Sequence, residues 1–250
     1  MARTALPGRL IWRAARVVER ITETPHAATL LLDVPGWPGH RPGQHLDVRL
    51  TAEDGYQAVR SYSIATPEDG ERLAITVELL DDGEVSPYLV EDVLPGDQLE
   101  VLGPIGGHFV WEISQGGPLL LVAGGSGIVP LMAMLRHRGD AGSRVSSRLL
   151  YSARSDADLI YRAELDARAV NETGLDVLYT LTRRQPPGWH GYARRVDRAM
   201  LEEIAWPVAN APKIYVCGPT AFVETVADQL TALGHDPLAI KTERFGPTGV

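Results

Sequence analysis

The sequence predicts two consecutive domains of different fold class, an all-β domain over residues 1–113 and an α/β domain over residues 118–250. In the first half, short β-rich runs alternate with Pro-Gly and Asp-Gly turns, which is typical of an antiparallel barrel or sandwich. In the second half, apolar strands alternate with helical segments, which indicates a parallel sheet covered by helices. The pattern of predicted elements changes at the Gly- and Pro-containing stretch 115–118, which is the expected hinge between the two domains.

The first domain is expected to form a six-stranded antiparallel β-barrel. The expected strands cover residues 10–19, 28–34, 45–50, 58–64, 73–80 and 98–102. One helix is expected over residues 86–93, because Ser86 is a favourable N-cap and Pro87 suits the first helical position.

The second domain is expected to contain a parallel sheet with helices on both faces. The expected strands cover 119–123, 149–152, 175–181, 213–217 and a last stretch near 238–241, and the expected helices cover 129–137, 159–170, 198–204 and 221–233. The strand ends near residues 123, 152, 182 and 217 should share one edge of the sheet. Ligands of open α/β sheets bind at this carboxyl edge.

Composition excludes several classes of function. The net charge is −8 without any basic tract, so nucleic acid is not an expected partner. The sequence shows no secretory leader and no apolar run of the roughly 20 residues that a membrane span needs, so a cytoplasmic protein without membrane contact is expected. A monomer is favoured, although the sequence does not determine the oligomeric state. Cys217 is the only cysteine, and the seven histidines are dispersed, so we expect no disulfide, iron–sulfur cluster or metal site.

The segment from Leu119 to Pro130 runs from an apolar strand through glycines into a helix. Glycines allow a pyrophosphate to approach the backbone closely, and a helix N-terminus supplies free N–H groups and a positive dipole end. Pro130 stands where the third glycine of G-x-G-x-x-G would be, so a standard Rossmann dehydrogenase is a poorer match. A glycine-rich turn without a ligand is the alternative.

Arg154 follows the next strand, at a place where a site for NAD commonly has an acidic residue. A guanidinium suits a 2′-phosphate, so NADPH is expected in preference to NADH, although NADH stays possible. In the alternative interpretation Arg154 forms a surface ion pair with Asp156 or Asp158. The arginines at 183–184 either assist in binding the phosphate or are only solvated.

Several short motifs follow one another along nearly the whole chain. They are Pro42-Gly43-Gln44, Arg60-x-Tyr62-Ser63, Gly83-x-x-Ser86, Gly103-Pro104-x-Gly106, the glycine-rich loop, Cys217-Gly218-Pro219 and Glu243-x-Phe245. Each motif is weak alone, but the ordered set closely resembles the ferredoxin-NADP reductase family. The resemblance implies a FAD-binding barrel followed by an NAD(P)-binding domain, with no fused iron–sulfur domain.

The resemblance implies roles for the barrel residues. Tyr62 would stack on the flavin ring, Arg60 would neutralise a flavin phosphate, and Ser63 would hydrogen-bond flavin N5. The backbone of residues 76–78 would meet the pyrimidine edge, and the helix at Ser86 would bind a second phosphate, which favours FAD over FMN. The implied flavin-binding residues are Arg60, Ser61, Tyr62, Ser63, Thr76, Val77, Glu78, Gly83, Val85 and Ser86. A surface arginine, a barrel-core tyrosine and a capping serine are the alternatives. The Glu78 side chain is not expected to contribute to flavin binding, because many members of the family carry a basic residue near this position.

The resemblance also implies roles in the second half of the chain. Cys217 would lie near nicotinamide C4, Glu243 would orient the nicotinamide or relay a proton, and Phe245 would contact or shield the junction of the two rings. Ser63, Cys217 and Glu243 are therefore the candidate catalytic residues. The implied nucleotide-binding residues are Gly124, Gly125, Ser126, Gly127, Pro130, Ser152, Arg154, Arg183, Cys217, Gly218, Pro219 and Phe245. Alternatively, Cys217 is a small buried apolar group and Glu243 an exposed carboxylate. His45 is either structural or a contact at the flavin edge.

The activity that the resemblance implies is hydride transfer from NADPH to FAD, followed by transfer of single electrons to an acceptor. A fused iron–sulfur domain needs cysteines that are absent here, and a fused haem domain needs a longer chain. A separate ferredoxin or oxygenase component is therefore the expected acceptor. One alternative is a flavin-binding electron-transfer or regulatory subunit that does not itself oxidise NAD(P)H. Another is an NADP-binding protein without flavin.

Overall fold

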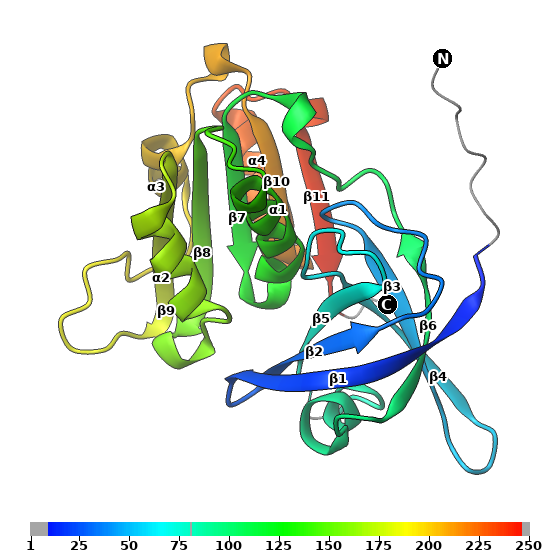
Figure 1. The fold of residues 1–250 in the computed structure, drawn as a ribbon. Helices are drawn as coiled ribbons and strands as arrows, with labels where there is room; N and C mark the ends of the chain where they lie inside the picture. The colour runs from blue at the N-terminus through cyan, green and yellow to red at the C-terminus, as the bar shows by residue number, and fades with distance from the viewer. Residues whose placement is uncertain (1–9, 81, 247–250) are drawn as a thin grey trace, which may run out of the picture.

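The computed structural model describes residues 10–80 and 82–246, and its strands form two separate sheets (Figure 1). The first sheet has six strands in the order β4-β3-β6-β1-β2-β5, and all its pairings are antiparallel. Its strands are β1 (Trp12–Thr24), β2 (Ala27–Asp33), β3 (His45–Thr51), β4 (Gln57–Ser63), β5 (Arg72–Glu78) and β6 (Gln98–Ile105). The predicted six-stranded antiparallel domain is confirmed.

The two edge strands of this sheet meet in a short bridge between Ile64 and Ile75, which curls the sheet toward a barrel. Alternate side chains point inward and form a core that includes Leu30, Val48 and Ile75. Past Ile75, the end of β5 over residues 76–78 pairs with β2 only, among the described residues. Backbone groups on the other side of this end are therefore free to bind something else.

The helical segment between β5 and β6 covers residues 86–92 and ends in a π-helical turn, Tyr88–Asp92. The prediction of Ser86 as its N-cap is wrong. Ser86 lies within the helical segment, and its hydroxyl accepts a hydrogen bond from the backbone N–H of Leu80 at 3.1 Å. This bond closes the loop before the helix, and it is so tight that a Cβ at Gly83 would lie 2.6 Å from the Ser86 hydroxyl.

The second sheet has five parallel strands in the order β11-β10-β7-β8-β9, as the α/β prediction required. The strands are β7 (Leu119–Gly124), β8 (Ser147–Ser155), β9 (Leu175–Arg184), β10 (Lys213–Pro219) and β11 (Ile240–Phe245), and the helices are α1 (Ile128–Asp140), α2 (Arg162–Asn171), α3 (Arg198–Ile204) and α4 (Thr220–Ala232). Ala123 pairs with Tyr151 on one side and with Cys217 on the other, so the strand ends share one edge as predicted.

Successive side chains of β7 point to opposite faces of this sheet. Leu121 packs in one core with α1 and α2, whereas Leu120 packs in another core with α3 and α4. The helix predicted from residue 159 begins at Arg162, because Tyr161 adopts a left-handed backbone conformation just before it. The last strand extends to Phe245, beyond its predicted end.

The two sheets are joined by a shared core and by polar contacts. Ala65 and Ala74 of the barrel belong to the same apolar cluster as α1. The Arg136 guanidinium on α1 donates to the Ala65 carbonyl at 2.8 Å, and the Tyr215 hydroxyl on β10 donates to the Val110 carbonyl at 2.8 Å. In the part of the chain that the structure describes, no helix is long and apolar enough to cross a membrane.

Candidate cofactor-binding site

The glycine-rich loop after β7 faces the free end of barrel strand β5. A Cβ added at Gly125 would lie 3.8 Å from the carboxylate of Glu78, the last residue of β5. The loop that was predicted to bind a pyrophosphate and the strand that was predicted to border a flavin therefore meet across the boundary between the two sheets.

The conformation of the loop depends on its glycines. Gly125 has a φ of +56°, in the left-handed region. A Cβ at Gly127 would lie 2.1 Å from the carbonyl oxygen of Cys217, so the loop packs directly on β10. The turn Gly125–Gly127 runs directly into α1, and the Ile128 N–H already donates to the carbonyl of Gly125. No side chain caps the start of this turn, so the N–H groups of Gly125 to Gly127 are the ones left for an anion. A cradle of this kind fits the pyrophosphate of a dinucleotide. Ser126 lies between the two glycines, and Pro130 is buried in the first turn of α1.

Glu243 lies at the contact between β11 and the barrel. It pairs in register with Cys217 of β10, and its Oε1 atom lies 3.7 Å from Nδ1 of His45 on β3. His45 is in turn the cross-strand partner of Ser63 on β4. The contact between Glu243 and His45 thus links the three candidate catalytic residues, with Cys217 beside Glu243 and Ser63 beside His45.

Burial changes the protonation of this cluster. The Glu243 side chain is 22% exposed, and burial raises its pKa to about 7. Burial lowers the pKa of His45, against the opposing charge of Asp47. The pKa of the Cys217 thiol is well above its usual value, because the residue is buried and lies near the Glu243 carboxylate. Near neutral pH the cluster therefore holds a neutral thiol and a carboxyl group that can take up or release a proton.

One oxygen of Glu243 has no partner. Its Oε2 atom is buried and accepts no hydrogen bond from any described residue. A buried polar atom without a partner is costly, and at such a site it commonly indicates a missing ligand or water. The alternative that Glu243 is an ordinary exposed carboxylate is wrong, because the strand β11 carries it into the interface. Phe245 is half-buried two residues further along the same strand, opposite Pro219.

Arg60 and the loop before the barrel helix come together. The Arg60 guanidinium donates to the Glu84 carboxylate at 2.7 Å, which places it beside Gly83. Both side chains of the pair are 50% exposed, so the ion pair is weak and open to exchange with a phosphate. The Ser61 hydroxyl donates to Asp47 at 2.6 Å on the outside of β4.

Other predicted flavin-binding residues lie largely in the barrel core. The Tyr62 ring is half-buried against that core, and burial raises its pKa to about 12. Val77 and Val85 are buried, so only their backbone groups can face a ligand. The Thr76 side chain is also buried, and its hydroxyl is used in a hydrogen bond within the protein.

Ser152 and Arg154 lie at the carboxyl edge of the parallel sheet, with Arg183 at the end of the neighbouring strand. Ser152 pairs with Gly124, which places it beside the glycine-rich loop. Arg154 and Arg183 are exposed. The alternative surface pair of Arg154 does not form, since Asp156 pairs with Arg162 and Asp158 accepts a hydrogen bond from Ser155.

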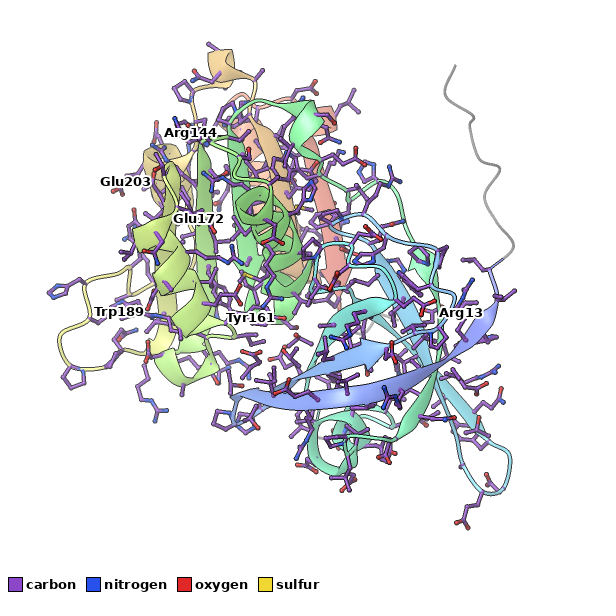
Figure 2. All side chains as sticks on the ribbon, in the orientation of Figure 1. Arg13, Arg144, Tyr161, Glu172, Trp189 and Glu203 are labelled. Carbon is purple, nitrogen blue, oxygen red and sulfur yellow. The ribbon has the colours of Figure 1, made fainter. Side chains whose placement is uncertain are left out.

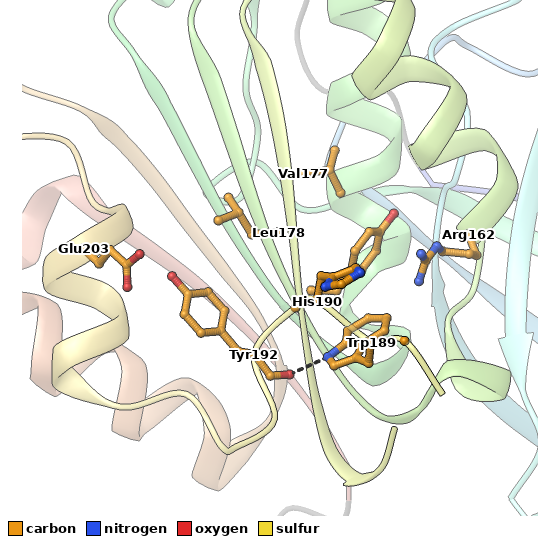
Figure 3. Close-up of a pocket in the computed structure, with 10 residues that line it drawn as sticks. Arg162, Val177, Leu178, Trp189, His190, Tyr192 and Glu203 are labelled. Atoms are coloured by element: carbon orange, nitrogen blue, oxygen red, sulfur yellow. Dashed lines mark hydrogen bonds between the residues drawn. The ribbon is translucent and has the colours of Figure 1, made fainter. Parts of the chain in front are cut away.

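Sequence reasoning missed residues that only the fold brings to the interface. Arg136 on α1 and Tyr161 before α2 contact the barrel, and no local motif marks either of them. A second missed feature is an open groove of about 580 Å³ along β9, lined by aromatic residues such as Tyr179 and Trp189 (Figure 3). The Arg162 guanidinium lies 4.2 Å from the centre of the Tyr179 ring in this groove. The groove contains none of the residues assigned to a cofactor.

Two family models match the chain. The model described as "Oxidoreductase FAD-binding domain" matches residues 15–111, the region of the barrel. The model described as "Oxidoreductase NAD-binding domain" matches residues 121–228, from β7 into α4. The first model therefore spans the strands of the barrel, and the second spans β7 to β10 of the parallel sheet but not β11.

Two curated proteins and one solved structure are similar over most of the chain. The glycine betaine monooxygenase reductase subunit of Pseudomonas aeruginosa is 31% identical over 244 residues, covering 96% of this chain but only 65% of that protein. Ferredoxin–NADP reductase B of Sorangium cellulosum is 33% identical over 208 residues, covering 81% of this chain and 84% of that protein. The flavohem-like FAD/NAD-binding domain of nitric oxide dioxygenase from Vibrio cholerae has a TM-score of 0.85 at 25% identity, covering 94% of this chain and 99% of that one.

Proposed function

The chain belongs to the ferredoxin-NADP reductase family of FAD- and NAD(P)-binding oxidoreductases, and on that premise we propose that it oxidises NADPH and supplies single electrons to a separate ferredoxin or oxygenase component. A bound FAD would supply the chemistry that converts one hydride into two single electrons. The observation that carries the proposal is the approach of the glycine-rich loop to the free end of β5, with Gly125 opposite Glu78.

On the barrel side, we propose that residues of three segments hold the flavin. Arg60 exchanges its partner Glu84 for a phosphate, and the loop from Gly83 to Ser86 binds the second phosphate of FAD. Tyr62 supports the ring by stacking. The backbone of residues 76–78 binds the pyrimidine edge, which is supported by the unpaired side of this strand end.

On the nucleotide side, Gly124 and the uncapped turn Gly125–Gly127, which leads into α1, bind the pyrophosphate. Arg154 and Arg183 bind the 2′-phosphate of NADPH, with Ser152 next to the ribose. Support comes from the exposed positions of both arginines and from the ion pair of Asp156 with Arg162, which leaves Arg154 to a ligand. Gly218 and Pro219 complete the turn after β10.

The cluster of Ser63, Cys217 and Glu243 is proposed to hold the reacting ends of both cofactors. Ser63 donates a hydrogen bond at flavin N5, and the neutral Cys217 thiol provides a small, uncharged contact for the nicotinamide. Glu243 orients the nicotinamide and holds or releases a proton at its carboxyl group, whose pKa of about 7 suits this task. Phe245 shields the junction from water.

The acceptor is proposed from the names of the relatives. One relative is a monooxygenase reductase subunit and another is a ferredoxin–NADP reductase, so a ferredoxin or an oxygenase component is the acceptor class we propose. We also propose a cytoplasmic location and a monomeric state. The domain limits 1–113 and 118–250 are supported by the two family matches, which end and begin on either side of the short turn Ile113–Gln115. The residues before 10 and after 246 lie outside the described residues.

Anaerobic mixing of the purified yellow protein with NADPH and, separately, NADH tests the proposal. We expect rapid bleaching of the flavin colour by NADPH, and slower bleaching by NADH. A yellow protein that neither nucleotide bleaches would instead be a flavin-binding subunit that receives electrons from a partner. A colourless preparation that takes up no FAD on reconstitution would contradict the flavin assignment itself.

A further inference from the structure

Tyr161 is a buried residue at the boundary of the two domains (Figure 2). It is 4% exposed and precedes α2 with a φ of 60° and a ψ of 20°. Left-handed backbone is rare for a residue with a bulky side chain, and it persists only where surrounding contacts hold it. Here the contacts are with the barrel, because the Tyr161 hydroxyl shares a hydrogen bond with the Thr76 hydroxyl on β5.

The Tyr161–Thr76 hydrogen bond is the first of three consecutive hydrogen bonds that reach into the barrel, and all three donate in the same direction. Thr29 on β2 donates its only hydroxyl proton to the Glu23 carboxylate at 2.7 Å. Its 2.7 Å contact with Thr76 must then be one in which Thr76 donates, since each hydroxyl has a single proton. Thr76 therefore accepts from Tyr161. The order of donation is Tyr161 to Thr76, Thr76 to Thr29 and Thr29 to Glu23.

Arg136 holds the Tyr161 ring in place. The guanidinium lies 4.8 Å from the centre of the ring and donates to the Ala65 carbonyl of the barrel at 2.8 Å. Glu164 binds the same guanidinium at 2.6 Å. The ring is thus clamped between α1 and the barrel, and its hydroxyl cannot turn to solvent without breaking these contacts.

The contact joins the end of β5, which the proposed function assigns to the flavin ring, to the turn that follows Arg154. Tyr161 ends the turn that begins after Arg154 at the carboxyl end of β8. Thr76 begins the end of β5 that we assigned to the flavin ring. We propose that Tyr161 is a positioning residue, which through Thr76 sets the end of β5 relative to the nucleotide-binding domain. The catalytic consequence rests on the proposed function. The link between the two domains, which is the Tyr161–Thr76 hydrogen bond, does not rest on it.

Hydrogen–deuterium exchange of the full-length protein without flavin tests this link between the domains separately from activity. In Tyr161→Phe we expect the amide of Val77, which lies opposite Ala28 in the ladder of β5 and β2, to exchange about tenfold faster, because Thr76 next to it loses the group that donates to its hydroxyl. Tyr179→Phe is the matched control, since the Tyr179 hydroxyl donates to Asp166 within the same domain at 2.8 Å. Wild-type exchange at Val77 in Tyr161→Phe would overturn the inference.

Anaerobic reduction of the flavin-loaded variants tests the catalytic consequence. Tyr161→Phe should lower the limiting rate of bleaching about tenfold, and should change the half-saturating NADPH concentration by less than about twofold. A limiting rate equal to that of Tyr179→Phe contradicts a positioning role. If the wild-type protein is not bleached at all, the proposed function fails, while the exchange result still tests the link between Tyr161 and Thr76.

A second pair of variants covers the case in which Tyr161→Phe does not fold. Thr76→Ser keeps a hydroxyl and should exchange like the wild type, whereas Thr76→Val should exchange at least as fast as Tyr161→Phe, because it loses the hydrogen bond to Thr29 as well as the one to Tyr161. The double variant Tyr161→Phe/Thr76→Val should exchange no faster than Thr76→Val, because the bond that Tyr161→Phe removes is already absent there. Equal exchange in Thr76→Ser and Thr76→Val, or effects that multiply in the double variant, would refute the proposal.

Discussion

The carboxylate of Glu243 lies 3.7 Å from Nδ1 of His45, across the boundary between the parallel sheet and the barrel. The two residues are almost two hundred positions apart in sequence, and neither belongs to a pattern that pairs them. Their contact also brings Cys217 and Ser63 to this boundary, because Cys217 is the cross-strand partner of Glu243 and Ser63 is that of His45.

Glu243→Gln should make stability less dependent on pH. Burial raises the pKa of Glu243 from 4.5 to about 7 in the folded protein. A raised pKa means that its contribution is fully present below pH 4.5 and is lost as pH rises through 7, where the folded state must ionise a buried group. The 4.5-to-7 shift corresponds to a loss of about 3 kcal/mol. Urea denaturation of the flavin-free protein between pH 4.5 and 8 measures the loss.

The substituted protein should lose correspondingly less stability over this range. Glu202→Gln, which changes an exposed glutamate on α3, serves as the control and should follow the wild type. Parallel curves for Glu243→Gln and the wild type would show that His45 and the surrounding groups compensate the buried charge.

Arg154→Ala should weaken NADPH binding far more than NADH binding. A charged hydrogen bond to a phosphate contributes about 1.5–3 kcal/mol, so the KM for NADPH should rise about 10- to 100-fold. Steady-state kinetics with both nucleotides measures the ratio. Arg144→Ala is a suitable control, because Arg144 precedes β8 at the opposite edge of the sheet (Figure 2). Equal losses for the two nucleotides would refute the assignment of the 2′-phosphate to Arg154.

Tyr62→Ala should reduce the retention of flavin. Stacking contributes about 1 kcal/mol beyond burial of area, so the flavin should dissociate several-fold more readily. The ratio of flavin to protein after gel filtration measures this. Tyr62→Phe keeps the ring and should keep both flavin and stability, which matters because Tyr62 also packs against the barrel core. Full flavin content in Tyr62→Ala would assign the stacking to another residue.

Gly127→Ala should be strongly destabilising, because its Cβ would lie 2.1 Å from the Cys217 carbonyl oxygen. The added Cβ and the carbonyl oxygen are both held by the backbone and cannot rotate away, so the loop must shift, at a cost of about 1–3 kcal/mol or more. Thermal melting measures the loss, and nucleotide binding should fall with it. Gly107→Ala is the control, since its Cβ would meet only the Arg41 side chain at 3.6 Å. An unchanged melting temperature in Gly127→Ala would mean that the loop can open without cost.

The sequence alone determined the order of strands and helices and the place of the glycine-rich loop. The reason is that strand alternation, helical periodicity and turn residues are local, so they can be read within short windows. Helix α3 was predicted with its observed bounds, Arg198–Ile204. The predicted start of α2 and the predicted cap at Ser86 were wrong, because a tertiary contact of Tyr161 and a loop-closing bond to Leu80 replaced the local preference.

Only the tertiary structure decided which residues meet between the two domains. The pairs His45–Glu243 and Tyr161–Thr76 join strands and turns that lie far apart in the chain, and their energies come from burial and exclusion of water. No window of sequence contains both members of either pair. Glu243, the fourth residue of β11, looks in the sequence like any exposed carboxylate, and its burial in the folded protein is what raises its pKa.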